Sequence, residues 1–339
     1  MSREDESGNQ IDHGAPPSPY FHRLLTSIHT PRPDRRSIKF VQPHDSSDES
    51  EYSKALEDIC GKSWKLFRVS PLHRFEYSAI RLRQYGKKLR EYLSVLKKSK
   101  EDMEYQAAFS VVDDLTRVPE DYEAIKVKVT CSKNGAAYNS YYEGLFISWG
   151  STRPPIGLKG VVSLPLLLCR GTAGLTNAVH ALLANFFDCS INRLVLTEEE
   201  VFWLSAMLPA VCPASRRNSR VEFHYSVPGI ETQGGFSVYC THQTLIDLWK
   251  SIHDDQKDEL LYSEIMTLQD GLMEHVYCVY GVNLGLCRLE KIISRDLYLA
   301  SNGVLKVRST TLADKLLSFI CTVSVILDCA TPSLCVQGE

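Results

Sequence analysis

The residues with the clearest potential for chemistry are one cysteine and two histidines in the last third of the chain. Cys240 ends an alternating run that begins at Gly235, His224 lies in the preceding alternating run, and His242 stands two residues after the cysteine. A thiol beside an imidazole can act as a nucleophile, which makes a cysteine-dependent hydrolase an alternative function. No third residue stands at a spacing that would orient either histidine. A buried or surface histidine is therefore the other interpretation.

Other enzyme signatures are missing from the sequence. It contains no GxSxG, HExxH, Walker A or GxGxxG pattern. Residues 170–174 superficially resemble an anion-binding loop but lack the lysine of a P-loop. The 11 cysteines include no CxxC or paired zinc spacing. We therefore expect a protein that is not an enzyme, with no cofactor, no metal and no small-molecule substrate.

The cellular compartment is indicated by the start of the chain and by its cysteines. The first residues are polar and acidic, without the apolar core of a secretory signal. We interpret the cysteines as reduced thiols of a cytosolic or nuclear protein. The longest apolar run, residues 316–327, is shorter than the roughly 20 residues that cross a bilayer. It predicts a buried helix, and no membrane partner is expected.

The first 57 residues differ in composition from the rest. Residues 1–50 hold six of the 15 prolines and eight serines, so they cannot bury enough apolar surface to offset the entropy of ordering. We predict a disordered tail over 1–57. Ser18 and Thr30 precede prolines and Ser37 follows two arginines, so these three are phosphorylation candidates. An unmodified, solvated tail is the alternative.

Hydrophobic periodicity predicts the elements of a folded region over 58–339, with two possible subdomains at about 58–215 and 216–339. Helices are expected at 78–98, 175–187, 198–208, 241–252, 259–280 and 311–329. Strands are expected at 65–69, 125–131, 141–149, 160–168, 221–227, 235–240 and 282–289, with a hairpin over 297–307. Because strands and helices come in clusters, the pattern favours an α+β fold with largely antiparallel sheets and packed helices.

Positive charge is concentrated early in this folded region. Residues 60–100 contain twelve Lys and Arg against two acidic residues, a local +10 in a chain whose net charge is -3. On the predicted helix these side chains form a basic face suited to phosphates. A solvated helix face is the plainer alternative. The DNA-facing candidates on this helix are Arg81, Arg83, Lys87, Lys88, Arg90 and Lys98.

The hairpin over 297–307 could serve as a partner-binding edge. Asn302-Gly303 between two alternating runs is typical of a type I′ turn, in which both central residues need a positive φ. A strand near the chain end can add to the sheet of a partner through its backbone. The alternative is an internal hairpin covered by the last helix. The edge-strand candidates are Val304, Leu305, Lys306, Val307 and Arg308.

Residues 64–78, WKLFRVSPLHRFEYS, resemble the start of the folded region of the centromere protein L family. Further similar segments follow in the same order at 187–189, 202–207, 221–228 and 248–253, and with the hairpin and last helix the resemblance covers about 60–330. The basic charge at 78–98 exceeds the family pattern.

The resemblance implies a non-catalytic subunit of the inner kinetochore, part of the constitutive centromere-associated network, which acts in chromosome segregation during mitosis. It implies an obligate heterodimer with centromere protein N. It also implies contacts with centromere protein C, with the complex of centromere proteins H, I, K and M, and with the centromeric nucleosome and its linker DNA. The implied location is the nucleus, at the kinetochore of the chromosome.

Overall fold

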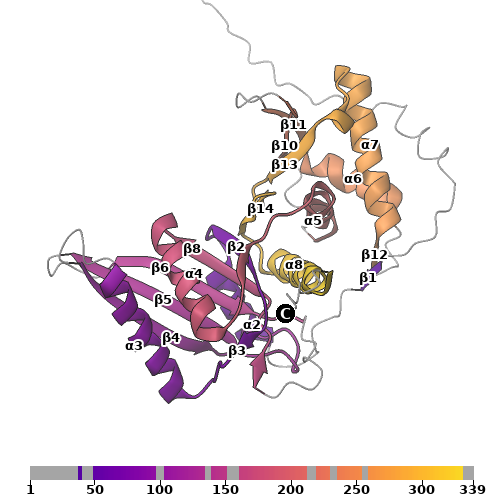
Figure 1. The fold of residues 1–339 in the computed structure, drawn as a ribbon. Helices are drawn as coiled ribbons and strands as arrows, with labels where there is room; N and C mark the ends of the chain where they lie inside the picture. The colour runs from indigo at the N-terminus through magenta and orange to yellow at the C-terminus, as the bar shows by residue number, and fades with distance from the viewer. Residues whose placement is uncertain are drawn as a thin grey trace, which may run out of the picture.

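The backbone is organised around one long antiparallel sheet (Figure 1). In the computed structural model, the described residues are 37–39, 49–96, 103–133, 139–150, 160–211, 219–229, 235–253 and 259–330. The strand order is β11-β10-β13-β14-β15-β2-β8-β6-β5-β4, and β9 also pairs with β2. All described strand pairs are antiparallel, and helices pack on both faces, which confirms the α+β class.

The first half of the sheet alternates as its sequence predicts. Along β5, Val127 and Val129 are fully buried whereas Lys128 between them is exposed, because successive side chains of a strand point to opposite faces. Its strands are β2 (Trp64–Val69), β4 (Met103–Val112), β5 (Ala124–Lys133), β6 (Asn139–Ile147), β8 (Leu166–Gly171) and β9 (Ile191–Arg193).

Two helices cover one face of this half, α3 (Ala79–Leu96) and α4 (Ala173–Phe187). Leu89 and Leu93 of α3 and Phe187 of α4 are buried in the core that they share with this face of the sheet. The predicted helices at 78–98 and 175–187 are thus confirmed. Their apolar stripes are long and regular, which makes them the most predictable kind of element.

The second half of the sheet carries its helices on the opposite face, where they form the larger core. Its strands are β10 (Arg220–Ser226), β11 (Gly235–Thr241), β13 (Arg288–Ile293), β14 (Leu297–Ala300) and β15 (Val304–Val307). Its helices are α5 (Glu198–Val211), α6 (His242–Ile252), α7 (Tyr262–Tyr280) and α8 (Thr310–Ala330). The helix starts expected at 198 and 241 are confirmed to within one residue. Thr197 and Glu200 form a capping box before α5, and Thr241 caps α6.

The two halves share one sheet and, on one of its faces, the larger core. Strand β2 pairs with β15 on one side and with β8 on the other. Trp64 and Leu66 of β2 lie in the same apolar cluster as Leu299 and Leu317 from the end of the chain. The sheet is therefore continuous across residue 215, and the division into two subdomains there stays a prediction.

Three segments differ from their predictions. Residues 160–168 form β7 (Val161–Val162), which pairs with β3 (Leu72–His73), and then β8, because Pro165 interrupts the ladder between them. Residues 284–286 form a short 3-10 helix, η2 (Leu284–Leu286), before β13 begins. The hairpin closes with a three-residue loop in which Gly303 alone has a positive φ, of 74°, so the predicted type I′ turn is wrong.

The predicted tail over 1–57 overlaps two elements. Helix α2 (Glu49–Ile59) inserts Leu56 and Ile59 into the larger core, since a spacing of three places both on one helix face. Strand β1 (Ser37–Lys39) pairs with β12 (Glu259–Leu261). Disorder is therefore the wrong prediction for these two segments, because average composition hides short apolar patterns. The remaining residues of 1–57 lie outside the described part of the chain.

Candidate interaction surfaces

The predicted partner edge at 304–308 lies inside the sheet. Strand β15 pairs with β14 over its full length, and on its other side Val304 and Leu305 pair with β2 while the Gly61 N–H donates to the Val307 carbonyl. Leu305 and Val307 are fully buried. The edge prediction is wrong, because its backbone groups are already used within the chain.

At the two ends of the strand order, β11 and β4 each have a strand neighbour on one side within the described residues, and the short β9 pairs there with β2 alone. The core is open at β11, where the inward-facing Phe236, Val238 and Cys240 are only partly buried. At β4, by contrast, Tyr105 and Phe109 are buried in the core that α3 helps to form. The edge at β11 is therefore the one at which a further strand or helix could cover partly buried apolar side chains.

The face of the second half that lies opposite α5–α8 carries a row of side chains that includes two lysines and a histidine. Register places His224, Lys291, Ala300, Val304 and Lys65 side by side across five neighbouring strands. Neighbouring strands are about 4.8 Å apart, so the two lysines lie three strand spacings, or about 14 Å, from each other. His224, Lys291 and Lys65 are polar, whereas Ala300 and Val304 between the two lysines are apolar and Ala300 is buried.

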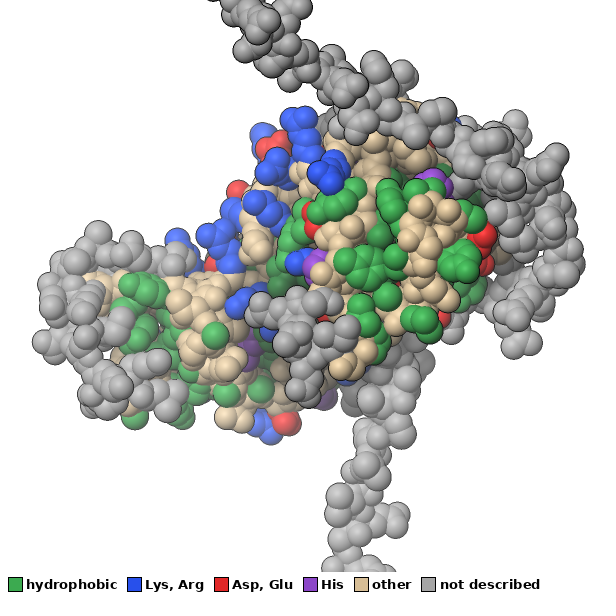
Figure 2. Space-filling view, turned by 90° about the horizontal axis from the view of Figure 1, so that it is seen from above, with side chains coloured by type: hydrophobic (Ala, Val, Ile, Leu, Met, Phe, Trp, Pro, Cys, Tyr) green, Lys and Arg blue, Asp and Glu red, His purple; other side chains and the backbone are tan. Residues whose placement is uncertain are grey.

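A second row on the same face runs next to the first. It consists of Tyr239, Glu222, Ile293, Tyr298 and Lys306, again in direct register. Beyond these rows the face adds Arg220 and Arg288, so five basic side chains accompany one glutamate on these register positions. Figure 2 shows a band of Lys and Arg side chains between the two lobes of the molecule. We call Lys65, Arg220, Arg288, Lys291 and Lys306 the open basic face.

The one glutamate at these register positions, Glu222, takes part in a local hydrogen-bond network. Ser237 Oγ donates to Glu222 Oε1 at 2.6 Å and lies 3.1 Å from His224 Nδ1. The Arg220 guanidinium lies 3.4 Å from the centre of the Tyr239 ring, a cation–π contact. Because the hydroxyl of Ser237 donates to a carboxylate, His224 is not placed to remove its proton, and this cluster is organised as structure.

The basic face of α3 is also exposed. Arg83, Lys87 and Arg90 follow at spacings of four and three on its outer side, and Lys88 is exposed as well. Arg81 is paired with Glu76 at 3.1 Å, and Lys87 lies 3.9 Å from Glu91. Lys98 lies outside the described residues. Arg83, Lys87 and Arg90 thus share one solvent-facing side of α3, whereas Arg81 and Lys88 are exposed on another side.

The structure does not assemble the predicted cysteine–histidine dyad with His224. Cys240 pairs with Val221 and packs against the core, whereas His224 lies on the open face, so the sheet separates the two side chains. Burial raises the pKa of the Cys240 thiol to about 12, which leaves it protonated near neutral pH and argues equally against activation by His242. His242 is itself buried, at the first position of α6.

Other chemical sites are few in the described residues. There, no group of three or more His, Cys, Asp and Glu side chains is arranged to hold a metal ion, and no described helix has the length and apolarity to cross a membrane. Of the phosphorylation candidates, Ser37 lies in β1, whereas Ser18 and Thr30 fall outside the described residues.

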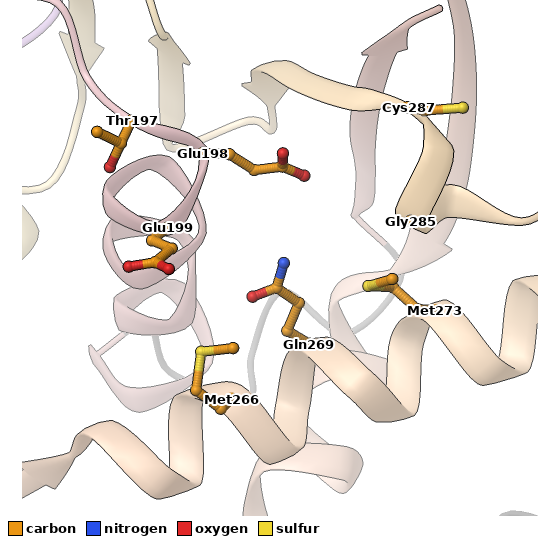
Figure 3. Close-up of a pocket in the computed structure, with 8 residues that line it drawn as sticks. All are labelled: Thr197, Glu198, Glu199, Met266, Gln269, Met273, Gly285 and Cys287. Carbon is orange, nitrogen blue, oxygen red and sulfur yellow. The ribbon is translucent and has the colours of Figure 1, made fainter.

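One cleft opens between α5 and α7 (Figure 3). It encloses about 540 Å³. Glu198 and Glu199 extend from the start of α5, and Met266, Gln269 and Met273 extend from α7. Gly285 and Cys287 close it on the third side. The sequence did not predict this cleft, because its residues come from three elements that only the fold brings together.

Known proteins are similar to this chain over most of its folded region. Residues 58–324 match the model of the centromere protein L family. This chain belongs to the centromere protein L family. It is 26% identical to centromere protein L of Xenopus tropicalis over 280 residues, which are 78% of each chain. The human and chicken proteins of that name are 24% and 22% identical over 258 and 256 residues.

Membership of the centromere protein L family makes this chain a centromere protein. The human comparison covers 73% of this chain and 74% of the relative, and the chicken comparison 72% and 73%. The matched segment starts in the last turn of α2 and ends within α8, so it includes the whole long sheet. The resemblance inferred from residues 64–78 is thereby confirmed.

Proposed function

We propose that the chain is a non-catalytic assembly subunit of the inner kinetochore, which pairs with centromere protein N and helps bind centromeric chromatin during kinetochore assembly. Its further partners would be centromere protein C and the complex of centromere proteins H, I, K and M. Family membership supports the setting, and the observation that carries the proposal is a free, incompletely covered sheet edge next to an open basic face. The expected location is the centromere in the nucleus.

Pairing with centromere protein N would use β11. An added strand satisfies the outward backbone groups of an edge strand, and it would also cover the half-exposed Phe236 and Val238. The backbone hydrogen bonds of β11 would provide affinity. Its alternating side chains would fix the register of the added strand.

The pairing is tested with Val238→Asp and, as a matched control, Val111→Asp. Both valines are half-buried on terminal strands, so both variants should lose comparable folding stability. Val238→Asp should abolish co-elution with centromere protein N in gel filtration, whereas Val111→Asp should retain it. Equal co-elution of the two folded variants would exclude β11 as the pairing edge.

Linker DNA would lie on the open basic face, because that face presents spaced lysines and arginines without a covering helix among the described elements. Each phosphate neutralised by a lysine contributes about -0.9 to the slope of log affinity against log salt. The exposed stripe of Arg83, Lys87 and Arg90 on α3 supports a second DNA contact in the assembled complex.

Two triple variants separate these surfaces. Lys65→Ala, Lys291→Ala and Lys306→Ala together should weaken linker-DNA binding by the heterodimer and reduce the salt slope by about 3. The matched set Arg83→Ala, Lys87→Ala and Arg90→Ala removes the same charge from α3. An unchanged slope in the first set would place the DNA elsewhere, and an unchanged slope in the second would remove α3 from the interface.

A further inference from the structure

The cleft between α5 and α7 combines a soft apolar wall with an acidic rim. Met266 and Met273 provide flexible thioether side chains that adapt to irregular apolar ligands. Glu198 and Glu199 stand on the opposite side, and Figure 3 shows Glu198 extending into the space above Gln269. This chemistry suits a segment that brings apolar anchors together with positive charge.

Helix α7 has a second apolar stripe beside its buried one. Met266, Met273, Tyr277 and Tyr280 follow at spacings of seven, four and three, so they share one side of the helix. Tyr277 is 55% exposed, Tyr280 is 65% exposed, and neighbouring Leu286 is 73% exposed. The apolar wall of the cleft thus continues along α7 to an exposed aromatic end.

The chain's own N-terminal segment is tethered at the start of this stripe. In the antiparallel pair, Ser37 lies opposite Leu261 and Lys39 opposite Glu259, so the chain before Ser37 leaves the pair at the α7 end. Met273 lies eleven residues beyond Tyr262, which is about 17 Å along a helix. The nine residue steps from Ile28 to Ser37 can span about 30 Å, so residues 20–28 can reach the cleft.

The sequence of residues 20–28, YFHRLLTSI, has the chemistry that the cleft requires. Five of its nine residues are large and apolar: Tyr20, Phe21, Leu24, Leu25 and Ile28. Residues 20–36 contain four arginines against one aspartate, a net charge of +3. Positive charge close to the apolar anchors would face Glu198 and Glu199 across the cleft. Asp270 and Glu274, which are exposed on α7, add further negative charge to this region.

We propose that residues 20–28 of this chain bind in the cleft between α5 and α7, with their apolar side chains on Met266 and Met273 and with Arg23 facing Glu198 and Glu199. The β1–β12 pair is the anchor that keeps the segment near this cleft. Because the tether is short, binding within one molecule has a high effective concentration.

A photo-crosslinking experiment with the full-length chain tests the proposal. Benzoylphenylalanine is placed at position 21, irradiated, and its crosslinks are mapped by mass spectrometry. The expected product is a crosslink within one chain to the peptide that contains Met266 or Met273. The same amino acid at position 10, upstream of the apolar segment, is the control and should not label that peptide. Crosslinks only between two chains, or only to other peptides, would overturn the proposal.

Thiol labelling gives a second measurement on the full-length chain. Cys287 lines the cleft, whereas Cys278 is exposed on α7 outside the cleft-lining set. Phe21→Ser with Leu24→Ser should increase the labelling rate of Cys287 severalfold and leave that of Cys278 unchanged. Ile11→Ser serves as the control for a change elsewhere in the N-terminal segment. An unchanged Cys287 rate in the double variant would contradict occupation of the cleft.

Discussion

Gly86 controls how closely α3 approaches the sheet. A Cβ built at this position would lie 2.8 Å from the Ala107 carbonyl oxygen, which is too close for a real contact. Gly86→Ala should therefore lower the free energy of unfolding by about 1–2 kcal/mol, even though alanine favours a helix by about 1 kcal/mol. Urea denaturation measures the change. Gly174→Ala in α4, where the added Cβ meets open space, should be neutral or stabilising. Equal effects in both variants would contradict the close contact.

His180 makes stability depend on pH. It is buried, with Nε2 3.1 Å from the Tyr142 hydroxyl, and burial lowers its pKa from 6.5 to about 4. The unfolded chain takes up the proton first, so the stability that this histidine contributes above pH 6.5 should fall by up to about 3 kcal/mol as the pH drops toward 4.

The variant His180→Leu isolates this contribution. Its free energy of unfolding should be lower at neutral pH, because the Tyr142 hydroxyl loses its partner, but it should depend less on pH between 6.5 and 4. Parallel pH curves for the two proteins in urea denaturation would show that His180 does not titrate in this window.

At the level of elements, a buried ion pair fastens α8 to the first half of the sheet. Arg117 Nε donates to Asp314 Oδ1 at 2.8 Å, the two side chains are 5% and 13% exposed, and Trp149 Nε1 donates to the Asp314 carbonyl at 3.1 Å. Asp314→Ala should cost about 3–5 kcal/mol, because it leaves a buried guanidinium without its carboxylate. Thermal unfolding measures this. Glu91→Ala, which removes the exposed partner of Lys87, should change stability by less than about 1 kcal/mol. A loss of stability of similar size in both variants would show that the buried Arg117–Asp314 pair does not hold α8 in place.

The elements themselves were largely predictable because their patterns are local. The stripe of α3 and the alternation of β5 depend on residues a few positions apart, and so do the caps at Thr197 and Thr241. The neighbours of β15 were not predictable in this way. Its sequence shows a hairpin partner in β14, but its pairing with β2 depends on residues from the start of the folded region. An edge strand and an internal strand show the same alternation of apolar and polar residues. The sequence therefore could not distinguish them, and the prediction that β15 is an edge strand was wrong.

For the whole molecule, the candidate surfaces were the least predictable part. Lys65 and Lys306 stand near opposite ends of the folded region, and only the strand order places them on one face. Alternation could have marked Lys291 and Lys306 as outward-facing, but not as neighbours. The basic face of α3 was visible because a single helix carries it. Sequence reasoning therefore favours charges that are contiguous along the chain over those that topology gathers.

The position of β2 between β8 and β15 has a consequence for protein synthesis. The ribosome releases Trp64–Val69 early, but one of the strands that flanks it emerges only after residue 307. Until then Lys65 lacks its strand partner Val304, and the Leu66 N–H lacks the Gly303 carbonyl to which it donates. Trp64 also lacks the apolar cover supplied by α8. A nascent chain that stops before Val304 should be retained by chaperones and degraded, and pulse-chase measurement of its half-life against the full chain would show this.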